Sequence, residues 1–192
     1  MKWQSGKVLK EFDIEKDGKK LSVKFRFLKK NEDAEEMTKY INNIVSEKDN
    51  WLSMVKVVTL EQESNFLKSK LKEQGGKNKY VVVDVDGKFS GSAEVRFGMM
   101  GNSHTCSFGI SLLDYVRGMG IGTKLMEFLI KFAKKNGAEI LYIEAYKGNK
   151  RALHIYENKL GFKEYGVKPK FRKKKVNGKV SYDDEVLLWR KI

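Results

Sequence analysis

The segment YVRGMGIGTKL (115–125) places three glycines at alternate positions directly before an amphipathic run. Glycine lowers helix stability, so its repetition where a helix should begin indicates a backbone that must turn tightly or approach another molecule closely. The first turn of a helix carries unpaired N–H groups and the positive end of the helix dipole, and it attracts anions. The pattern predicts a phosphate-binding turn around Gly118, Gly120 and Gly122, with a plain strand-to-helix turn as the alternative.

Two common phosphate-binding patterns do not describe this loop. The dinucleotide pattern G-x-G-x-x-G fails because Thr123 stands where the third glycine is required. The P-loop pattern fails because Thr123 precedes Lys124 and because Arg117 occupies the place of its first glycine. The loop instead reads Arg-x-x-Gly-x-Gly, from Arg117 to Gly122.

A second pattern lies downstream in NKRALHIYENKLGF (149–162). Its characteristic residues are Asn149, Ala152, Tyr156, Gly161 and Phe162. The two patterns, separated by one expected helix and one expected strand, resemble the two signatures of the GNAT superfamily of acyl-CoA N-acetyltransferases. The resemblance extends over roughly residues 80–192, and it implies that the phosphate groups are those of coenzyme A.

The resemblance implies a mixed α/β fold in a single domain, residues 1–192, with a central, mostly antiparallel sheet of about 7 strands flanked by about 4 helices. It also implies an N-acetyltransferase that moves an acetyl group from acetyl-CoA to a primary amine by direct attack in a ternary complex. The alternatives are a non-catalytic module on the same fold, which senses CoA or binds nucleic acid, and a transferase for longer acyl chains.

The coenzyme A contacts that the resemblance implies fall in three short segments. Leu112 and Leu113 would contribute backbone N–H and C=O groups, one of which could polarise the acetyl carbonyl, while their side chains could be ordinary core. Asn149 suits a helix N-cap as well as a cofactor contact. The full set is Leu112, Leu113 and Asp114, then Arg117, Gly118, Met119, Gly120, Ile121, Gly122 and Thr123, and finally Asn149, Ala152 and Tyr156.

Tyr156 matches the general acid that the family usually uses to protonate the departing thiolate; the alternative is a partly buried helix tyrosine. A base is also needed, because an amine with a pKa of ~10.4 is almost entirely protonated at neutral pH. His104 stands where the family often has a glutamate, and a pKa of ~6.5 suits a base. Glu94 and Glu185 are rival carboxylates. Each of these three could instead be an ordinary surface or ion-paired residue, and no metal is expected.

The single cysteine, Cys106, is expected on the same strand face as His104. An acyl-cysteine intermediate is conceivable there, but a buried structural thiol is the preferred interpretation. One cysteine cannot form an internal disulfide, which favours a reducing compartment and, by default, the cytoplasm.

The 192 residues carry a net charge of +14 and are 41% hydrophobic, which suits one globular domain and favours anionic partners. No apolar run approaches the ~18 residues of a membrane span, and the N-terminal segment does not resemble a secretory signal. The absence of helix-turn-helix, zinc and RNP-like patterns disfavours nucleic acid as a partner. We expect an amine-bearing small molecule or peptide as acceptor, and a monomer or homodimer. The acidic segment 183–185 could line the acceptor cleft, and the basic run 168–175 could face substrate, a partner or water.

The elements that must position these residues follow from periodicity and turn residues. Asp17-Gly18 and Asp86-Gly87 predict two hairpins, and Thr59 with Gln62 predicts a capping box at the start of a helix. A strand–loop–helix–strand unit over 104–146, with antiparallel flanks, predicts a mixed sheet. The other expected elements are a helix around 37–45, a helix ending near Lys135, a helix over 149–160, and strands over 161–167 and 181–190 joined by a turn at Asn177-Gly178.

Overall fold

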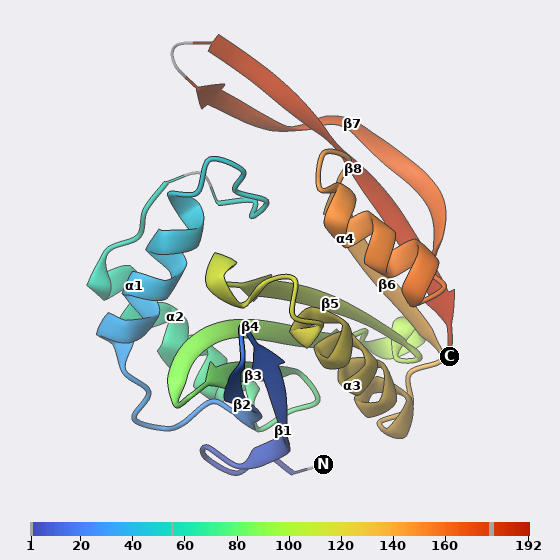
Figure 1. Cartoon of the computed structure of the whole chain (residues 1–192). Coiled ribbons are helices and arrows are strands. Elements are labelled where there is room, and N and C mark those ends of the chain that lie inside the picture. Colours follow the sequence, from blue (N-terminus) through green and yellow to red (C-terminus); the bar gives the residue numbers. More distant parts are fainter. Residues whose placement is uncertain (1, 55, 177–178) are drawn as a thin grey trace.

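The computed structural model describes residues 2–54, 56–176 and 179–192 of the chain (Figure 1). Within these residues eight strands form one sheet in the order β1-β2-β3-β4-β5-β6-β8-β7. Neighbours pair antiparallel except β5 and β6, which pair parallel. The sheet is therefore mixed and mostly antiparallel, as expected, with eight strands rather than about seven. The strands are β1 (Val8–Lys16), β2 (Lys19–Phe27), β3 (Lys79–Val85), β4 (Lys88–Phe97), β5 (Thr105–Leu112), β6 (Ile140–Tyr146), β7 (Lys163–Val176) and β8 (Lys179–Lys191).

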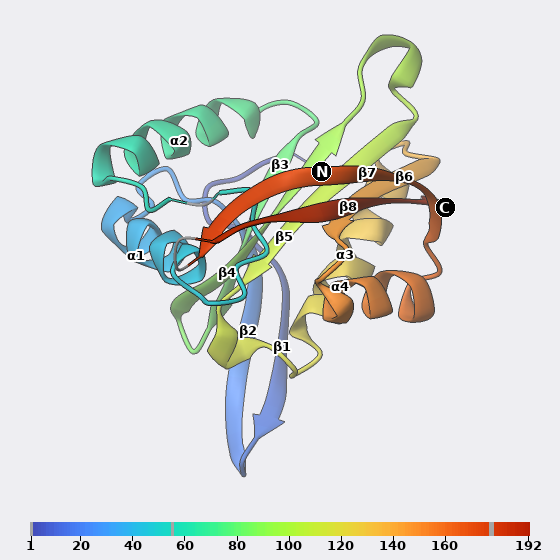
Figure 2. The same cartoon turned by 90° about the horizontal axis from the view of Figure 1, so that it is seen from above.

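Helices cover both faces of the sheet. Helices α1 and α2 pack on one face, and α3 and α4 lie on the other side (Figure 2). The helices are α1 (Ala34–Val45), α2 (Leu60–Glu73), α3 (Ile121–Lys135) and α4 (Lys150–His154), with a π-helical turn over Ile155–Lys159 and short 3₁₀ turns over Met100–Asn102 and Asp114–Val116. In the part of the chain that the structure describes, no helix is both long enough and apolar enough to cross a bilayer.

Strand β3 contributes side chains to a hydrophobic cluster on each face of the sheet. Successive side chains of a strand point to opposite faces. Accordingly Val81 and Val83 join the cluster under α3, whereas Tyr80 and Val82 join the cluster under α1 and α2. Every residue of β3 is buried, which is the pattern of a central strand covered on both faces.

The local sequence signals identify the turns and the helix start correctly. Asp17 and Gly18 have φ of 51° and 71°, and Asp86 and Gly87 have φ of 50° and 77°. Two successive positive φ angles define the tight hairpin turn whose twist matches that of the strands. The capping box of α2 is formed as predicted, with the Thr59 side chain and the Gln62 side chain each accepting from the other's backbone N–H.

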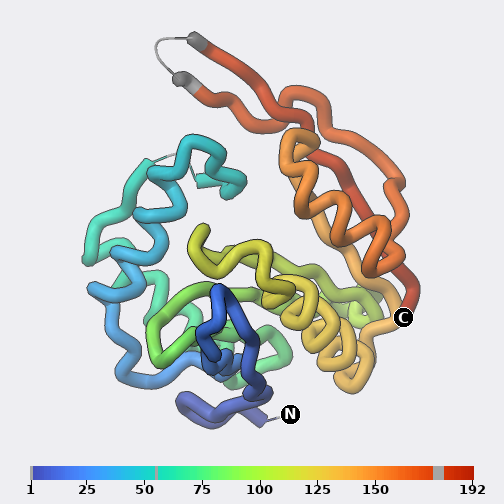
Figure 3. Tube along the Cα trace, viewed as in Figure 1, coloured from blue at the N-terminus to red at the C-terminus, as the bar shows by residue number. Residues whose placement is uncertain are grey.

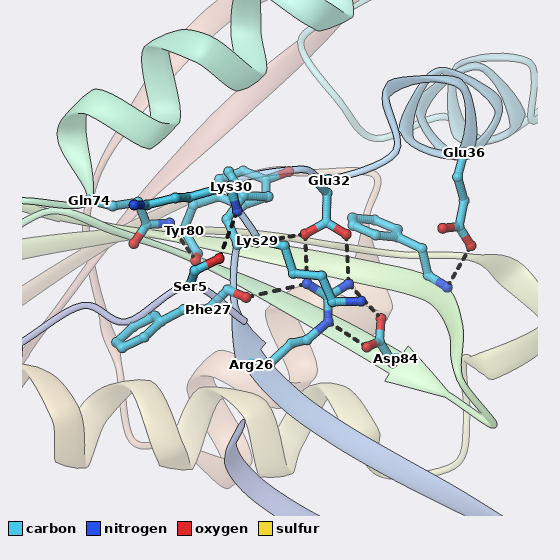
Figure 4. Close-up of polar contacts among 12 residues, drawn as sticks. Ser5, Arg26, Phe27, Lys29, Lys30, Glu32, Glu36, Gln74, Tyr80 and Asp84 are labelled. Atoms are coloured by element: carbon cyan, nitrogen blue, oxygen red, sulfur yellow. Dashed lines mark hydrogen bonds and ion pairs between the residues drawn. The ribbon is translucent and has the colours of Figure 1, made fainter. Parts of the chain in front are cut away.

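A buried ion network ties the N-terminal half together (Figure 4). The Arg26 guanidinium donates to both oxygens of Glu32 at 2.7 and 2.8 Å and also donates to Asp84. The side chains of Arg26 and Glu32 are only 6% and 4% exposed. Buried charges persist where they are paired in this way, so the network orients β2 against β3 and the turn that leads to α1.

The last hairpin differs from expectation. The strand predicted over 161–167 corresponds to β7, which begins at Lys163 and continues through the basic run 168–175. The strand predicted over 181–190 corresponds to β8, which runs from Lys179 to Lys191. A bulge between Lys168 and Arg172 accommodates Pro169, which has no N–H to pair. The predicted turn at Asn177-Gly178 lies outside the described residues.

Candidate functional site

Strands β5 and β6 pair over only three residues and then separate. The paired positions run from Thr105 opposite Ile140 to Ser107 opposite Tyr142. Strand β5 continues against β4 to Leu112, and β6 continues against β8 to Tyr146. Figure 1 shows the two strands side by side near the C-terminus and diverging from there. The divergence opens the middle of the sheet and removes a neighbour from the β6-facing edge of β5.

The backbone groups that face this opening follow from the pairing register. The Leu113 N–H donates to the Ser90 carbonyl of β4 at 2.9 Å. Hydrogen-bonding direction alternates along an antiparallel strand, so Leu112 and Ile110 direct their backbone groups toward the opening. The Leu112 carbonyl accepts from Arg117 Nε at 2.8 Å, which leaves its N–H for a ligand. The Leu113 N–H is therefore engaged within the sheet, whereas the backbone groups of Leu112 and Ile110 face the opening.

The glycine loop lies beside this edge and begins α3. Gly118 and Gly120 have φ of 82° and 75°, the left-handed region that side chains rarely adopt. A Cβ at either glycine would have no atom within 4 Å, so the backbone conformation selects glycine here and the space outside the turn is open. Gly120 caps α3 without a side-chain hydrogen bond, while Ile121 is fully buried and anchors the first turn. The first N–H groups of α3 are therefore available to an anion.

Arg117 and Asp114 have different surroundings in the loop. Arg117 forms a two-pronged ion pair with Glu47, at 2.6 and 2.9 Å, in addition to its bond to Leu112. Asp114 is largely exposed and lies 3.5 Å from Arg117. Arg117 thus holds the end of β5 against the segment after α1, and a phosphate contact would have to use its remaining donors. Met119 is partly buried against the core, and Thr123 lies in the first turn of α3.

The second motif begins as an α-helix and then widens. The Asn149 side chain caps α4 by accepting from the Ala152 N–H at 3.2 Å, so the N-cap role is present. Beyond His154 the chain forms a π-helical turn, where the Leu160 N–H donates to the Ile155 carbonyl. The single helix predicted over 149–160 is therefore only partly correct. Wide turns of this kind recur at functional sites, and this one carries Tyr156.

Two cavities meet at Tyr156. The first, which we call the loop-side cavity, has a volume of about 690 Å³ and reaches Leu112, Arg117 and Gly122. The second, which we call the acidic cavity, has a volume of about 780 Å³ and reaches β4, β6, β8 and α2. The lining that the two share consists of Trp51, Leu52, Ile110, Ser111, Asn149, Ala152 and Tyr156.

The Tyr156 hydroxyl is positioned to meet a ligand. Its ring packs against Phe162, with ring centroids 6.2 Å apart. Among the residues described, none forms a hydrogen bond with its hydroxyl. Burial raises the pKa of Tyr156 to about 12, because the phenolate would lose hydration there. Tyr156 is thus a neutral hydrogen-bond donor across the physiological pH range.

The three candidate bases are not equally placed. Glu94 and Glu185 line the acidic cavity. Glu94 pairs with Lys70 at 2.6 Å and with Arg96 at 2.8 Å, and Glu185 pairs with Lys168. His104 is exposed just before β5, at the end away from Leu112, and lines neither cavity. The structure therefore brings Glu94, Glu185 and Tyr156 together and leaves His104 outside.

A hydroxyl network that the sequence did not indicate lies where the cavities meet. The Tyr40 hydroxyl bonds the Ser111 hydroxyl, and it also lies 3.1 Å from the Ser111 carbonyl and 3.2 Å from the Ser92 hydroxyl. Ser111 lines both cavities, and Ser92 lines the acidic one. Because these residues come from α1, β4 and β5, only the packed structure shows that they are connected.

Contacts between distant segments hold the residues after α1 against β7. Arg172 of β7 donates to the carbonyls of Asn50 and Leu52, at 2.8 and 2.6 Å, and to Asp183. Its guanidinium also lies over the Trp51 ring, 5.6 Å from the centroid. Figure 3 shows the segment after α1 and the hairpin of β7 and β8 on the same side of the molecule, away from the N-terminus. One part of the basic run is thus structural.

Cys106 has no access to this chemistry. Its side chain is 1% exposed within the core, and it lines neither cavity. Burial raises the pKa of its thiol to about 12, so the nucleophilic thiolate is scarce. Within the described ranges no group of His, Cys, Asp and Glu side chains could hold a metal ion.

Comparison with known proteins places this geometry in a family. The sequence matches the Acetyltransferase (GNAT) family over residues 46–162. Among curated proteins, no sequence matches this chain. Solved structures resemble it at low sequence identity, which supports the fold.

An acetyltransferase of the GNAT family from Streptococcus pneumoniae superposes with a TM-score of 0.72 at 20% identity, over 88% of this chain and 99% of that one. An N-acetyltransferase from Staphylococcus aureus Mu50 superposes with a TM-score of 0.74 at 19% sequence identity, over 88% of this chain and 98% of that one. The structure of yncA from Salmonella typhimurium with its cofactor acetyl-CoA superposes with a TM-score of 0.69 at 19% sequence identity, over 88% of this chain and 93% of that one.

The chain belongs to the GNAT acetyltransferase family. It is an N-acetyltransferase that uses acetyl-CoA and acts on an amine. The site fits that cofactor: the open glycine turn and the free N–H groups of α3 suit its phosphates, and the unpaired edge of β5 suits the amides of its pantetheine arm.

Proposed function

We propose that this enzyme transfers acetyl directly to an amine-bearing small molecule or peptide, with both substrates bound at once on the two sides of Tyr156. The observation that carries the proposal is the position of Tyr156 on the shared wall of the loop-side and acidic cavities. The geometry allows an acyl donor and an acceptor to meet there without a covalent enzyme intermediate. The buried position of Cys106 supports the same conclusion.

Acetyl-CoA, when bound, supplies a thioester that an amine can attack. The residues of this chain would then do three things. The glycine loop, with Gly118, Gly120 and Gly122, and the first turn of α3 would hold the phosphates. The N–H groups of Ile110 and Leu112 would orient the arm, and one of them could polarise the acetyl carbonyl.

The bonds that form and break in the transfer suggest roles for the remaining residues. The amine nitrogen forms a bond to the acetyl carbon, the carbon–sulfur bond breaks, and the amine loses a proton. Tyr156 would donate a hydrogen bond to the departing sulfur, which leaves as a thiolate and takes its proton from solvent. Glu94 or Glu185 would receive the amine proton, directly or through water and the Ser111–Tyr40 hydroxyls. His104 would require a different conformation of the start of β5 to contribute.

Every group in this scheme comes from one chain, so the site is complete in a monomer and in each subunit of a homodimer. The lone thiol of Cys106 fits a reducing compartment such as the cytoplasm. The test is a thiol-release assay with acetyl-CoA across classes of amine, repeated with Tyr156→Phe. Thiol release that depends on an amine supports the proposal, and a Tyr156→Phe variant with unchanged turnover would remove Tyr156 from it.

A further inference from the structure

The acidic cavity contrasts with the rest of this basic protein. The chain has a net charge of +14, yet the charged residues that line this cavity in the described part of the structure are four glutamates and one arginine. Glu94 is neutralised by Lys70 and Arg96, and Glu144 and Glu185 both pair with Lys168. The remaining carboxylate belongs to Glu63.

Glu63 is buried without a partner. It lies one turn before Leu67 on the inner face of α2 and is 6% exposed. No hydrogen bond or ion pair reaches its carboxylate from any residue that the structure describes. Glu63 lines the acidic cavity, and burial raises its pKa above the ordinary value. Glutamate is rarely buried unless it is paired, because the carboxylate loses its hydration.

The surroundings of Glu63 suit a cation. Phe66 and Tyr80 line the same cavity and pack edge to face, with centroids 5.8 Å apart. Aromatic faces attract ammonium groups, and Phe66 already has the Lys70 ammonium 5.4 Å from its ring centre. An ammonium that entered here would meet an unpaired carboxylate and an aromatic wall.

Glu63 is also separate from the reacting end of the cavity. It lines the acidic cavity but not the loop-side cavity, whereas Tyr156 lines both. Figures 1 and 2 both place α2 and α4, which leads into Tyr156, on opposite sides of the molecule. Apolar residues such as Ile41 and Phe108 also line this cavity. A ligand that spans this distance needs a cation at one end and an apolar middle.

We infer that Glu63 binds a second ammonium group of the acceptor, and that the preferred acceptors are small aliphatic diamines. One amine would lie beside Tyr156 and receive the acetyl group, and the other would pair with Glu63. The inference rests on the proposed function and names the substrate class of the same site. The net positive charge of the protein does not oppose it, because the cavity itself is acidic.

The experiment compares α,ω-diamines of increasing length, each with the monoamine of the same length, in the thiol-release assay with acetyl-CoA. Paired compounds differ by a single ammonium group. The wild-type enzyme should prefer the best diamine by roughly 10- to 100-fold in kcat/KM, the usual worth of a hydrogen bond to a charged group. Glu63→Gln should lower kcat/KM for the diamine to about the value for the monoamine of the same length, and Glu61→Gln, exposed on the same helix, should behave like wild type.

A second measurement separates recognition from folding. Removal of an unpaired buried carboxylate relieves its desolvation cost, so Glu63→Gln should raise the midpoint of thermal unfolding. A variant that is more stable and less selective supports the inference. Equal rates for diamines and monoamines in the wild type, or equal losses for both in Glu63→Gln, would overturn it and leave the proposed function standing. Absence of thiol release with every amine would overturn both.

Discussion

Replacing Tyr156 with phenylalanine removes one oxygen atom from the wall between the two cavities. The ring keeps its packing against Phe162, so the fold and the cavity shapes should persist. The hydroxyl has no hydrogen-bond partner among the described residues, so no other protein group is left unpaired. The variant therefore tests the interaction of Tyr156 with the reacting groups and little else.

The size of the effect follows from the pKa of Tyr156. Burial raises this pKa to about 12, whereas a thiol has a pKa of ~8.5. Full proton transfer to the thiolate would be uphill by about 3.5 pKa units, or roughly 5 kcal/mol. Tyr156 should therefore keep its proton and donate a hydrogen bond to the developing charge. Such a bond contributes about 1.5–3 kcal/mol, which corresponds to a roughly 10- to 150-fold loss in kcat.

The assay is thiol release at saturating acetyl-CoA. Tyr156→Phe should lower kcat by this factor and change the KM for acetyl-CoA by less than about 3-fold, because the bond strengthens as charge develops on sulfur. Tyr165→Phe is the matched control, since the exposed Tyr165 lines neither cavity, and its kcat should stay within about 2-fold of wild type.

The pH profile gives an independent check. An acid with its pKa raised to about 12 stays protonated until the pH approaches that value. The wild-type kcat should therefore show no loss from Tyr156 near pH ~10, where an ordinary tyrosine ionises. The reasoning is refuted by an unchanged kcat in Tyr156→Phe, or by an alkaline loss near pH ~10 that the wild type shows and the variant lacks.

Three further predictions concern the glycine turn and the contacts of Arg172 and Asp183, which join β7, β8 and the segment after α1. Gly120→Ala should weaken acetyl-CoA binding in calorimetry and destabilise the fold by about 1–2 kcal/mol, because alanine resists a φ of 75°; Gly101→Ala, outside the left-handed region and in open space, should be nearly neutral. Arg172→Met should lower the free energy of unfolding in urea by about 1–3 kcal/mol, because the carbonyls of Asn50 and Leu52 lose their donor and Asp183 keeps only Lys174 as a partner; the exposed Lys173→Ala should not. Burial disfavours the Asp183 carboxylate, but hydrogen bonds from two cationic neighbours outweigh burial and hold its pKa below the usual value. Its contribution is therefore complete above pH ~4 and lost as the pH falls further, so the stabilities of wild type and Asp183→Asn should converge in acid.

Much of the fold and one half of the site could be predicted from local sequence. The Asp-Gly turns, the capping box at Thr59 and the left-handed glycines depend on a few adjacent residues, and each formed as expected. The Asn149 cap and the helical start of the second motif depend on similarly short-range contacts. Where a few neighbours decide the conformation, a sequence pattern is sufficient.

Other parts of the site depend on strand register, which local patterns do not specify. The resemblance that suggested His104 depends on its distance along the chain from the glycine loop, but the chain enters β5 at that point, and His104 lies at the end of the strand away from the cavities. The choice of Leu112 and Ile110 over Leu113 depends on one hydrogen bond from Leu113 to Ser90 of β4. Such pairings join residues far apart in the sequence, and a shift of one residue reverses which groups face the opening.

The sequence by itself determined the family, the cofactor and the turn that suits its phosphates, because the glycines and Tyr156 act through their own backbone and side-chain chemistry. Only the tertiary structure decided which charges stay uncompensated. The charge of Glu94 is compensated by Lys70 and Arg96, and the charge of Glu185 is compensated by Lys168. The Glu63 carboxylate has no such ion pair among the described residues. Coulombic pairing and desolvation depend on distance and burial, which exist only once α2, β4 and β7 have packed around the cavity.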